Sequence, residues 1–456
     1  MVMRAVMGPL VSPVVSSVVP KNTVKVVGLN IGFVRVAPPV RSYSYGTRPV
    51  MAYPGKVLVD NYVEPKDTVV TIVNGDSGGG GAAAQADELM VAQQTLLKTS
   101  AEYHVRFNFV HIGDAWNAPY GPKSTSDILK LTMGLIGASQ RLFSAKKMIV
   151  ACNTASTTDG PVLRDWIKLN APEVEVYSII VPTAKRLYES AQVKDASGGR
   201  KSTHIGVLAT MATTASGLYP LELAGLHAQK EGPDAVTIVH YSDDSIPHPR
   251  VFKGASPVPR NSEEEQRILK APGKGYTVQN VYCYAPPEWV SHLEGKHVGA
   301  GKKELDEEVR KDMMRFFELV GINRTNLSVL GLCCTHYPIV KEGIESAFKA
   351  FGEMIGVPLL DRVQIVSQGA LIAQGNILPD VARDVENGAY LRRQTPDWSV
   401  GIHTLSVTTG WPGNPSTETS VNTIKTIFSR YPKFIAETPL KIIPPFVPVQ
   451  FDPPSS

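Results

Sequence analysis

Two cysteines stand where a protein could carry out proton-transfer chemistry. Cys152 lies in the sequence ACNTAS and Cys334 in CTHYP, each beside small hydroxyl or amide side chains. Each follows a short apolar run, at 147–150 and 327–332, that is typical of a β-strand. Because α/β proteins place reactive groups where parallel strands end, the sequence predicts that both thiols lie at strand ends.

A pair of thiols indicates one kind of reaction. An unperturbed thiol has a pKa near ~8.5, so it can exchange a proton near neutral pH once it is positioned. Thiols on opposite faces of one carbon could remove a proton from one side and return one from the other. That is racemisation or epimerisation, and it needs neither a metal nor an organic cofactor. Nearby Ser77, Asn153, Thr154 and Thr335 offer donors that could bind a carboxylate.

Three other interpretations compete with this one. A single cysteine is most often a small buried hydrophobic residue, so the interpretation depends on there being two. Cys333, Cys334 and His336 could bind zinc, but their spacing does not match the usual C-x₂-C or H-x₃-H ligand pairs. The glycine run 78–81 could suggest a phosphate loop, but no Lys-Ser/Thr pair follows it.

Composition and charge exclude several classes of protein. The chain has 456 residues, 43% apolar and 19% charged, which is ordinary for two or three globular domains. Its apolar runs are too short for a membrane-spanning helix. Four cysteines, unevenly spaced, indicate free thiols in a reducing compartment, so we expect the cytoplasm or the mitochondrial matrix.

The net charge of +4 comes from the N-terminal segment. Seven basic residues and no acidic one precede Asp60, which leaves 39 basic and 42 acidic side chains in the rest of the chain. The body is therefore not a basic nucleic-acid binder. Residues 1–66 are typical of an organellar import sequence, but Pro9, Pro13 and Pro20 interrupt any amphipathic helix. An arm that packs on the body or on another subunit is the alternative.

Strand and helix patterns alternate along the rest of the chain. Expected strands are 68–73, 104–111, 147–150, 174–180, 204–209, 236–240 and 327–332. Expected helices are 84–97, 125–145 with Ser124 as the cap, 162–169, 182–192, 289–293, 303–319 and 339–351. Alternation at this spacing predicts right-handed crossover units and an α/β fold with mostly parallel sheets. Residues 210–219 are expected to form a loop that leads into a helical stretch.

The order of these elements suggests an internal duplication. A first α/β domain is expected at 67–203 and a second at 204–380, with an irregular, proline-containing insertion at 241–285. A segment at 381–435 would close the first domain, and a proline-rich tail would follow at 436–456. We expect two pseudo-symmetric, doubly wound domains with the active site at their interface. The N-terminal arm and the insertion are candidates for contact with other subunits.

Four motifs occur in the order DSGGGG from Asp76, GD at 113–114 followed by PYGPKS from Pro119, ACNTAS from Ala151, and CTHYP from Cys334. Together they resemble the motifs of glutamate racemases, which belong to the cofactor-independent aspartate/glutamate racemase superfamily. Weaker similarity covers IGVLATMATTASGLY at 205–219, PEWVSHLEG at 287–295 and TTG at 408–410. The resemblance extends over roughly residues 68–435.

The resemblance implies a role for each matched residue. Cys152 and Cys334 would be the two bases, Asp76 would assist Cys152, and Glu294 and His336 would serve Cys334. Amino-acid substrate would be bound by Ser77, Pro119, Tyr120, Gly121, Asn153, Thr154 and Thr335. No cofactor is implied, no metal is expected, and a homodimer is expected by resemblance only. One departure is Cys333, where the family usually has glycine; its side chain would crowd the site or point into the core.

These observations leave three functions open. One is glutamate racemisation. Another is a catalytically silent racemase fold with a structural or regulatory role in a larger assembly, which the long termini and the 241–285 stretch would suit. The third is the same chemistry on aspartate or a hydantoin, since the sequence does not set the depth of a side-chain pocket.

Overall fold

The computed structural model describes most of the chain after residue 68. The described residues are 26–27, 69–103, 105–192, 204–242, 249–286, 289–293, 302–321, 327–368, 377–387, 401–430 and 438–445. Glu294, the insertion's residues 243–248 and most of the N-terminal arm lie outside them. Of the arm, only strand β1 (Val26–Val27) is described, and it pairs in parallel with Glu175–Ser178.

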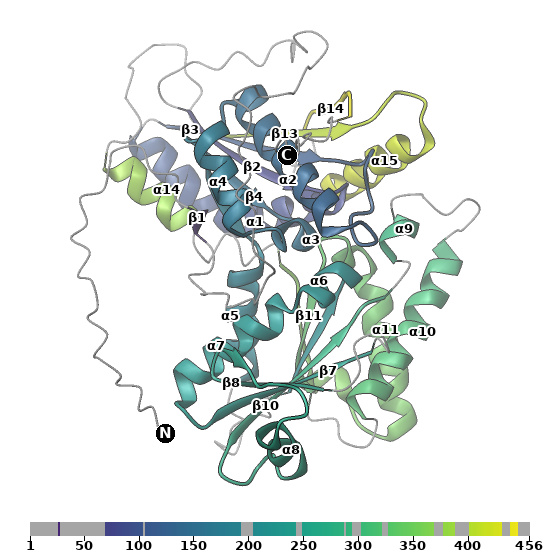
Figure 1. Cartoon of the computed structure of the whole chain (residues 1–456). Coiled ribbons are helices and arrows are strands. Elements are labelled where there is room, and N and C mark those ends of the chain that lie inside the picture. Colours follow the sequence, from purple (N-terminus) through teal and green to yellow (C-terminus); the bar gives the residue numbers. More distant parts are fainter. Residues whose placement is uncertain are drawn as a thin grey trace, which may run out of the picture.

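The first sheet has seven parallel strands in the order β1-β5-β4-β2-β3-β13-β14. Their bounds after β1 are β2 (Val69–Asp76), β3 (Arg106–Gly113), β4 (Lys147–Val150), β5 (Glu175–Ser178), β13 (Gly401–Thr409) and β14 (Leu440–Ile443). The last two strands come from the C-terminal part of the chain, which therefore returns to the first sheet (Figure 1).

The second sheet has the order β12-β11-β6-β10-β7-β8-β9. Its strands are β6 (His204–Ala209), β7 (Ala235–Tyr241), β8 (Arg250–Lys253), β9 (Ser256–Pro257), β10 (Thr277–Tyr284), β11 (Leu327–Cys333) and β12 (Gln364–Val366). Among the described strands of this sheet, the β7–β8 and β8–β9 pairs are antiparallel and the other pairs are parallel. The expected α/β fold with two mostly parallel sheets is confirmed.

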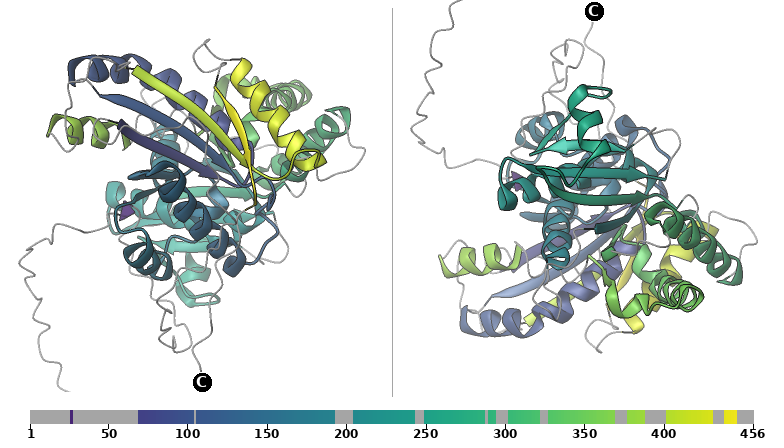
Figure 2. Two further views of the ribbon diagram at one scale, coloured as in Figure 1. Left: turned by 90° about the horizontal axis from the view of Figure 1, so that it is seen from above. Right: turned by 90° about the horizontal axis from the view of Figure 1, so that it is seen from below.

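Helices cover both faces of each sheet (Figures 1 and 2). Around the first sheet they are α1 (Gly80–Tyr103), α2 (Thr125–Phe143), α3 (Asn153–Ser156), α4 (Pro161–Asn170), α14 (Ile377–Glu386) and α15 (Pro415–Ser429). Around the second they are α5 (Ile180–Ala191), α6 (Met211–Ser216), α7 (Leu218–Glu231), α8 (Glu263–Lys270), α9 (Trp289–Leu293), α10 (Lys302–Val320), α11 (Lys341–Ile355) and α12 (Leu359–Arg362). The Ser124 hydroxyl accepts a hydrogen bond from the Asp127 N–H at 3.1 Å, which confirms the expected cap of α2.

The hydrophobic core follows from alternation along the strands. In β2, Ile72 packs with α1 on one face, whereas Val73 packs with α2 and α4 on the other. The α1 side of the first sheet and the α5–α7 side of the second form one continuous apolar cluster. The two halves are thus joined by buried side chains, and a separate cluster lies between the second sheet and helices α10 and α11.

Two expectations about elements were wrong. Residues 210–219 were expected to be a loop, but they contain α6, which Thr210 caps by accepting from the Thr213 N–H. Residues 241–285 were expected to be an irregular insertion, but they hold β8, β9, α8 and β10. Strand β10 pairs with β6 and β7 inside the second sheet. Five prolines in that stretch obscured its apolar alternation, and only pairing with distant strands reveals it.

Candidate active site

The first thiol stands at the end of a central strand. Cys152 follows β4 by two residues and caps the short helix α3, its Sγ accepting from the Ala155 N–H at 3.4 Å. The Cys152 Sγ–H donates to the Ser77 hydroxyl at 3.7 Å. Ser77 comes directly after β2, the neighbouring strand. Two adjacent carboxyl ends thus bring together residues far apart in the sequence.

The second thiol has the equivalent place in the second sheet. Cys334 directly follows β11, which lies between β6 and β12 as β4 lies between β2 and β5. Its Sγ is 3.9 Å from Nδ1 of His336. Helix α1 of the first half begins against this loop, because a Cβ added to Gly80 would lie only 2.8 Å from the His336 backbone nitrogen. The glycine-rich segment therefore allows close contact between the halves.

Burial controls the ionisation of Cys152. It raises the pKa of this thiol to about 11, although the hydrogen bond from the Ala155 N–H lowers it. The negative charge of Asp76 and that of a Cys334 thiolate act on this pKa in the same direction as burial. The two thiols therefore lie close enough for the charge of one to affect the other.

Asp76 ends β2 and is completely buried. Its Oδ1 accepts from the Gly78 N–H at 3.0 Å and lies 3.2 Å from Nε2 of His111. Its Oδ2 accepts from the Gly81 N–H. Asp76 affects Cys152 through its charge, and Ser77, its neighbour in sequence, contacts the thiol.

Asn153 is held by a side chain from the other half of the protein. Its Nδ2 donates to Oε1 of Gln368 at 2.6 Å, and its Oδ1 accepts from Gln368 Nε2 at 2.8 Å. The Tyr219 hydroxyl also donates to Asn153 Oδ1, at 2.5 Å. Gln368 follows β12, and Tyr219 lies in α7, so this buried network joins the first cysteine loop to the second sheet.

Thr154 belongs to a cluster of three hydroxyl groups. Its Oγ1 is 2.7 Å from that of Thr210 and 3.3 Å from that of Thr213, and the last two are 3.0 Å apart. Thr210 and Thr213 come from the start of α6. Sequence reasoning did not select them or Gln368, since the stretch before α7 reads as a loop and Gln368 matches no motif. The LATMATT sequence after β6 is the signal that could have found the threonines.

The Tyr120 side chain is hydrogen-bonded within the first half of the protein. Its hydroxyl donates to Oδ2 of Asp114 at 2.8 Å, and Asp114 also accepts from Thr409 at 2.7 Å. Burial raises the pKa of Asp114, and the hydrogen bond from Thr409 opposes this. Gly121 faces the second half, since a Cβ there would lie 3.2 Å from Thr210.

The remaining residues expected from the sequence differ in where they lie. Pro119 is half-buried in the loop before Tyr120, and Thr335 is buried beside Gly80. Glu294 lies outside the described residues. Cys333 points into the core: it is fully buried among the residues that pack between β11 and α5, and burial raises its pKa.

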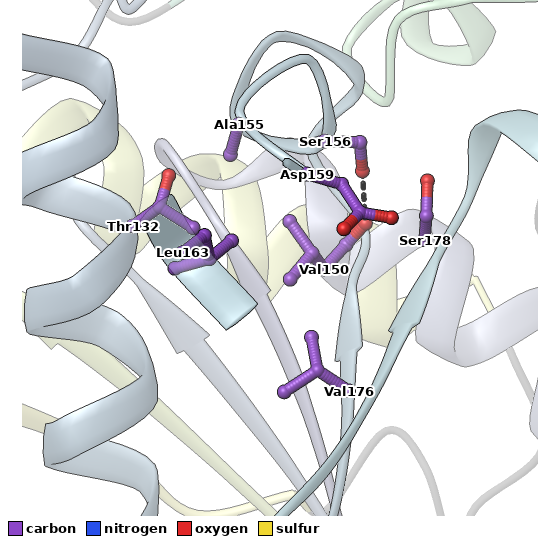
Figure 3. A pocket seen from close by; sticks show the side chains of 8 residues that line it. All are labelled: Thr132, Val150, Ala155, Ser156, Asp159, Leu163, Val176 and Ser178. Carbon is purple, nitrogen blue, oxygen red and sulfur yellow. Dashed lines mark hydrogen bonds between the residues drawn. The ribbon is translucent and has the colours of Figure 1, made fainter. Parts of the chain in front are cut away.

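Neither of two cavities in the described part of the chain is lined by Cys152 or Cys334. One, of about 10 Å³, lies behind the first cysteine loop (Figure 3). It is lined by Thr132, Val150, Ala155, Ser156, Asp159, Leu163, Val176 and Ser178. This is room for about one water molecule, and so too small for an amino acid. The other, of about 490 Å³, is an open hollow near the end of α11.

Two further features concern the described residues only. Their His, Cys, Asp and Glu side chains form no group of three that could hold a metal ion. Their helices include none that is long and apolar enough to cross a membrane.

The cluster as a whole is closed. Cys152, Cys334, Asp76, Ser77, Asn153, Thr154, Thr210, Thr335 and His336 are each at most 7% exposed. It contains two thiols, one carboxylate, one imidazole and several hydroxyl and amide donors. Such a set can move protons and bind carboxylates, and the apolar surroundings strengthen each interaction.

Comparisons with known proteins find distant relatives of the chain. No protein-family model matches the chain. It is 26% identical to a glutamate racemase of Carboxydothermus hydrogenoformans over 267 residues, which are 59% of this chain and 68% of that relative. It is 34% identical to a glutamate racemase of Limosilactobacillus fermentum over 117 residues, 26% of this chain and 38% of that relative.

Among solved structures, glutamate racemase isoform RacE1 from Bacillus anthracis is similar with a TM-score of 0.49 and 18% identity, covering 84% of this chain and 99% of that chain. The longer of the two sequence matches extends over more than half of the chain. The chain is therefore a distant homologue of the glutamate racemases.

Proposed function

We propose that the protein interconverts L- and D-glutamate without a cofactor, using Cys152 and Cys334 as the two bases. One observation carries the proposal. The thiols end equivalent strands of two similarly ordered sheets, and the charge of a Cys334 thiolate raises the pKa of Cys152. Proximity of this kind is what proton transfer at opposite faces of one carbon requires.

The proposed reaction has two proton transfers. The thiolate of one cysteine takes the α-proton, the C–H bond breaks, and its electron pair stays on the substrate, delocalised into the α-carboxylate. The thiol of the other cysteine then gives its proton to the opposite face and becomes a thiolate. Each turnover therefore exchanges the protonation states of the two sulfurs, and the reverse reaction restores them.

Helper groups are proposed for each thiol. Asp76, through its charge and through Ser77, serves Cys152, whereas His336, 3.9 Å from the sulfur, serves Cys334 together with Glu294. Substrate carboxylates and the ammonium group would be bound by Ser77, Asn153, Thr154, Thr335 and the Pro119–Gly121 loop. Since the Tyr120 hydroxyl is held by Asp114, we infer that this residue contributes through its backbone.

Substrate entry requires the two halves to separate at this cluster. The thiols are 5% and 6% exposed, and the Asn153 amide is paired with Gln368. An incoming carboxylate can replace Gln368 as the acceptor for Asn153 Nδ2, so the exchange conserves one hydrogen bond. The free-energy cost of the exchange is therefore that of separating the two halves at this buried contact.

The same pairing favours a second candidate function. If Gln368 keeps the Asn153 amide permanently, the protein is a catalytically silent racemase fold. A solution experiment separates the two. Purified protein is incubated with L- or D-glutamate in deuterium oxide, while optical activity is followed by circular dichroism and α-deuterium by NMR. Aspartate and hydantoins are included as rival substrates.

We expect the wild type to racemise glutamate and to incorporate deuterium from both enantiomers. Cys152→Ala and Cys334→Ala should each abolish racemisation, while each keeps exchange of at most one enantiomer through the remaining thiol. Cys283→Ala is the matched control, because Cys283 is a buried thiol in β10, outside the cluster. Exchange that is absent in the wild type for every substrate would refute the enzyme and support the silent fold.

A further inference from the structure

His111 connects Asp76 to a serine from the C-terminal part of the chain. Its Nε2 lies 3.2 Å from Asp76 Oδ1, and its Nδ1 lies 2.8 Å from the Ser406 hydroxyl. All three side chains are 0% exposed. His111 is on β3, between β2 and β13, and Ser406 is its direct partner in the β13 register. No motif in the sequence draws attention to either residue.

The chemistry of the three groups sets the direction of the hydrogen bonds. An ionised carboxylate only accepts, so with this form of Asp76 the His111 Nε2–H donates a hydrogen bond to Oδ1. In the neutral imidazole the other nitrogen then accepts, and Ser406 Oγ–H is the donor within reach. Ser406 therefore fixes the tautomer of His111, and His111 fixes one oxygen of Asp76.

Asp76 is thus held from both sides. Gly78 and His111 donate to Oδ1, and Gly81 donates to Oδ2. The Gly78 amide comes from the loop before α1, and the Gly81 amide comes from the first turn of α1. The bond from His111 comes from the neighbouring strand of the same sheet as Asp76. His111 therefore holds the carboxylate from within the sheet, and the two amides hold it from the segment that faces the His336 loop.

We propose that His111, with its tautomer set by Ser406, is a positioning residue for Asp76 in the proton transfer at Cys152. The inference rests on the proposed racemase function and deepens it. Without the bond from His111, Oδ1 loses a buried donor, and the carboxylate rotates or takes up a proton. Either change weakens its help to Cys152 and leaves Cys334, which has His336, unaffected.

Activity alone cannot test this, for a thermodynamic reason. The equilibrium constant of racemisation is one, so any variant lowers kcat/KM equally in both directions. Primary isotope effects on kcat/KM, measured with α-deuterated L- and D-glutamate, show whether the proton transfer at Cys152 or the one at Cys334 has become slower. A slower Cys152 step raises the effect for the enantiomer that gives its proton to Cys152 and lowers it for the other.

The variants are His111→Phe, which keeps the ring but neither bond, and His111→Gln, which can restore the donor to Asp76. Ser406→Ala is a smaller change in case the first variant does not fold. Asp76→Asn shows which isotope effects result when the proton transfer at Cys152 is impaired. We expect His111→Phe to lower kcat/KM about 10- to 100-fold, the loss typical of one hydrogen bond to a charged group. The isotope effects of His111→Phe for the two enantiomers should differ from each other in the same sense as those of Asp76→Asn; we call this difference a skew. His111→Gln should partly restore kcat/KM, and Ser406→Ala should show a weaker skew.

Two outcomes would overturn parts of the reasoning separately. Wild-type turnover together with unskewed isotope effects in folded His111→Phe or Ser406→Ala would refute the positioning role. His336→Asn serves as the reference for a defect on the Cys334 side. If the isotope effects of His111→Phe are skewed in the same sense as those of His336→Asn, the positioning role is refuted as well. Absence of turnover in the wild type would instead refute the proposed function on which the inference rests.

Discussion

Cys152 is expected to remain a protonated thiol through neutral pH in the substrate-free protein. Burial raises its pKa to about 11, and the charge of Asp76 adds to the increase. Compared with an ordinary thiol at ~8.5, this disfavours the thiolate by about 3 kcal/mol. At pH 7.5 roughly one molecule in 3,000 would carry the thiolate, against about one in ten for an unperturbed cysteine.

Asp76→Asn should make the ionisation of Cys152 easier and racemisation slower. The variant removes a negative charge that opposes the thiolate, so the pKa of Cys152 should fall. Racemisation should fall as well, because the group proposed to assist Cys152 is lost. A variant in which the thiolate forms more easily but reacts more slowly would distinguish assistance by Asp76 from simple activation of the thiol.

Thiolate absorbance at about 240 nm measures this ionisation in the folded protein. The signal from Cys152 is the difference between each protein and the same protein with Cys152→Ser, recorded from pH 7 upward. The control is Cys283→Ser, because burial raises the pKa of Cys283 as well and its removal should change nothing in this range. A wild-type midpoint at or below pH 9, or an upward shift in Asp76→Asn, would refute the reasoning.

Two further variants test what holds the site together. Gly80→Ala would place a methyl group 2.8 Å from backbone atoms of the His336 loop, so we expect racemisation to fall sharply while circular dichroism shows an intact fold. Unchanged kcat/KM would mean that the halves are not held together there. Lys147→Met should lower the free energy of unfolding by about 3 kcal/mol, measured in urea, because buried Lys147 pairs with Glu175 and Asp384 at 2.5 and 2.7 Å. Burial lowers the pKa of Lys147, but these two partners raise it overall, so the stabilisation should be complete below pH ~10.4 and lost as pH rises above it. An equal stability of the two proteins at pH 7 would contradict this.

Local patterns were sufficient where a strand is apolar throughout. The strands before the two cysteines were found with nearly the right bounds, because central strands of parallel sheets are buried on both faces. The same rule failed for β10, whose Thr277–Tyr284 run alternates weakly and follows several prolines. Its place between β6 and β7 depends on pairing with strands far away in the sequence.

The α/β class, the two thiols at strand ends and the likeness to glutamate racemases could all be inferred from the sequence. These depend on residue order and on local periodicity, which a chain carries without folding. Other contacts are visible only in the folded protein: Gln368 and Tyr219 hold Asn153, Thr210 and Thr213 join Thr154, and His111 supports Asp76. These contacts join residues from separate strands and from both halves. No local pattern encodes them, because they form only once strands far apart in the sequence pair and the two halves pack together.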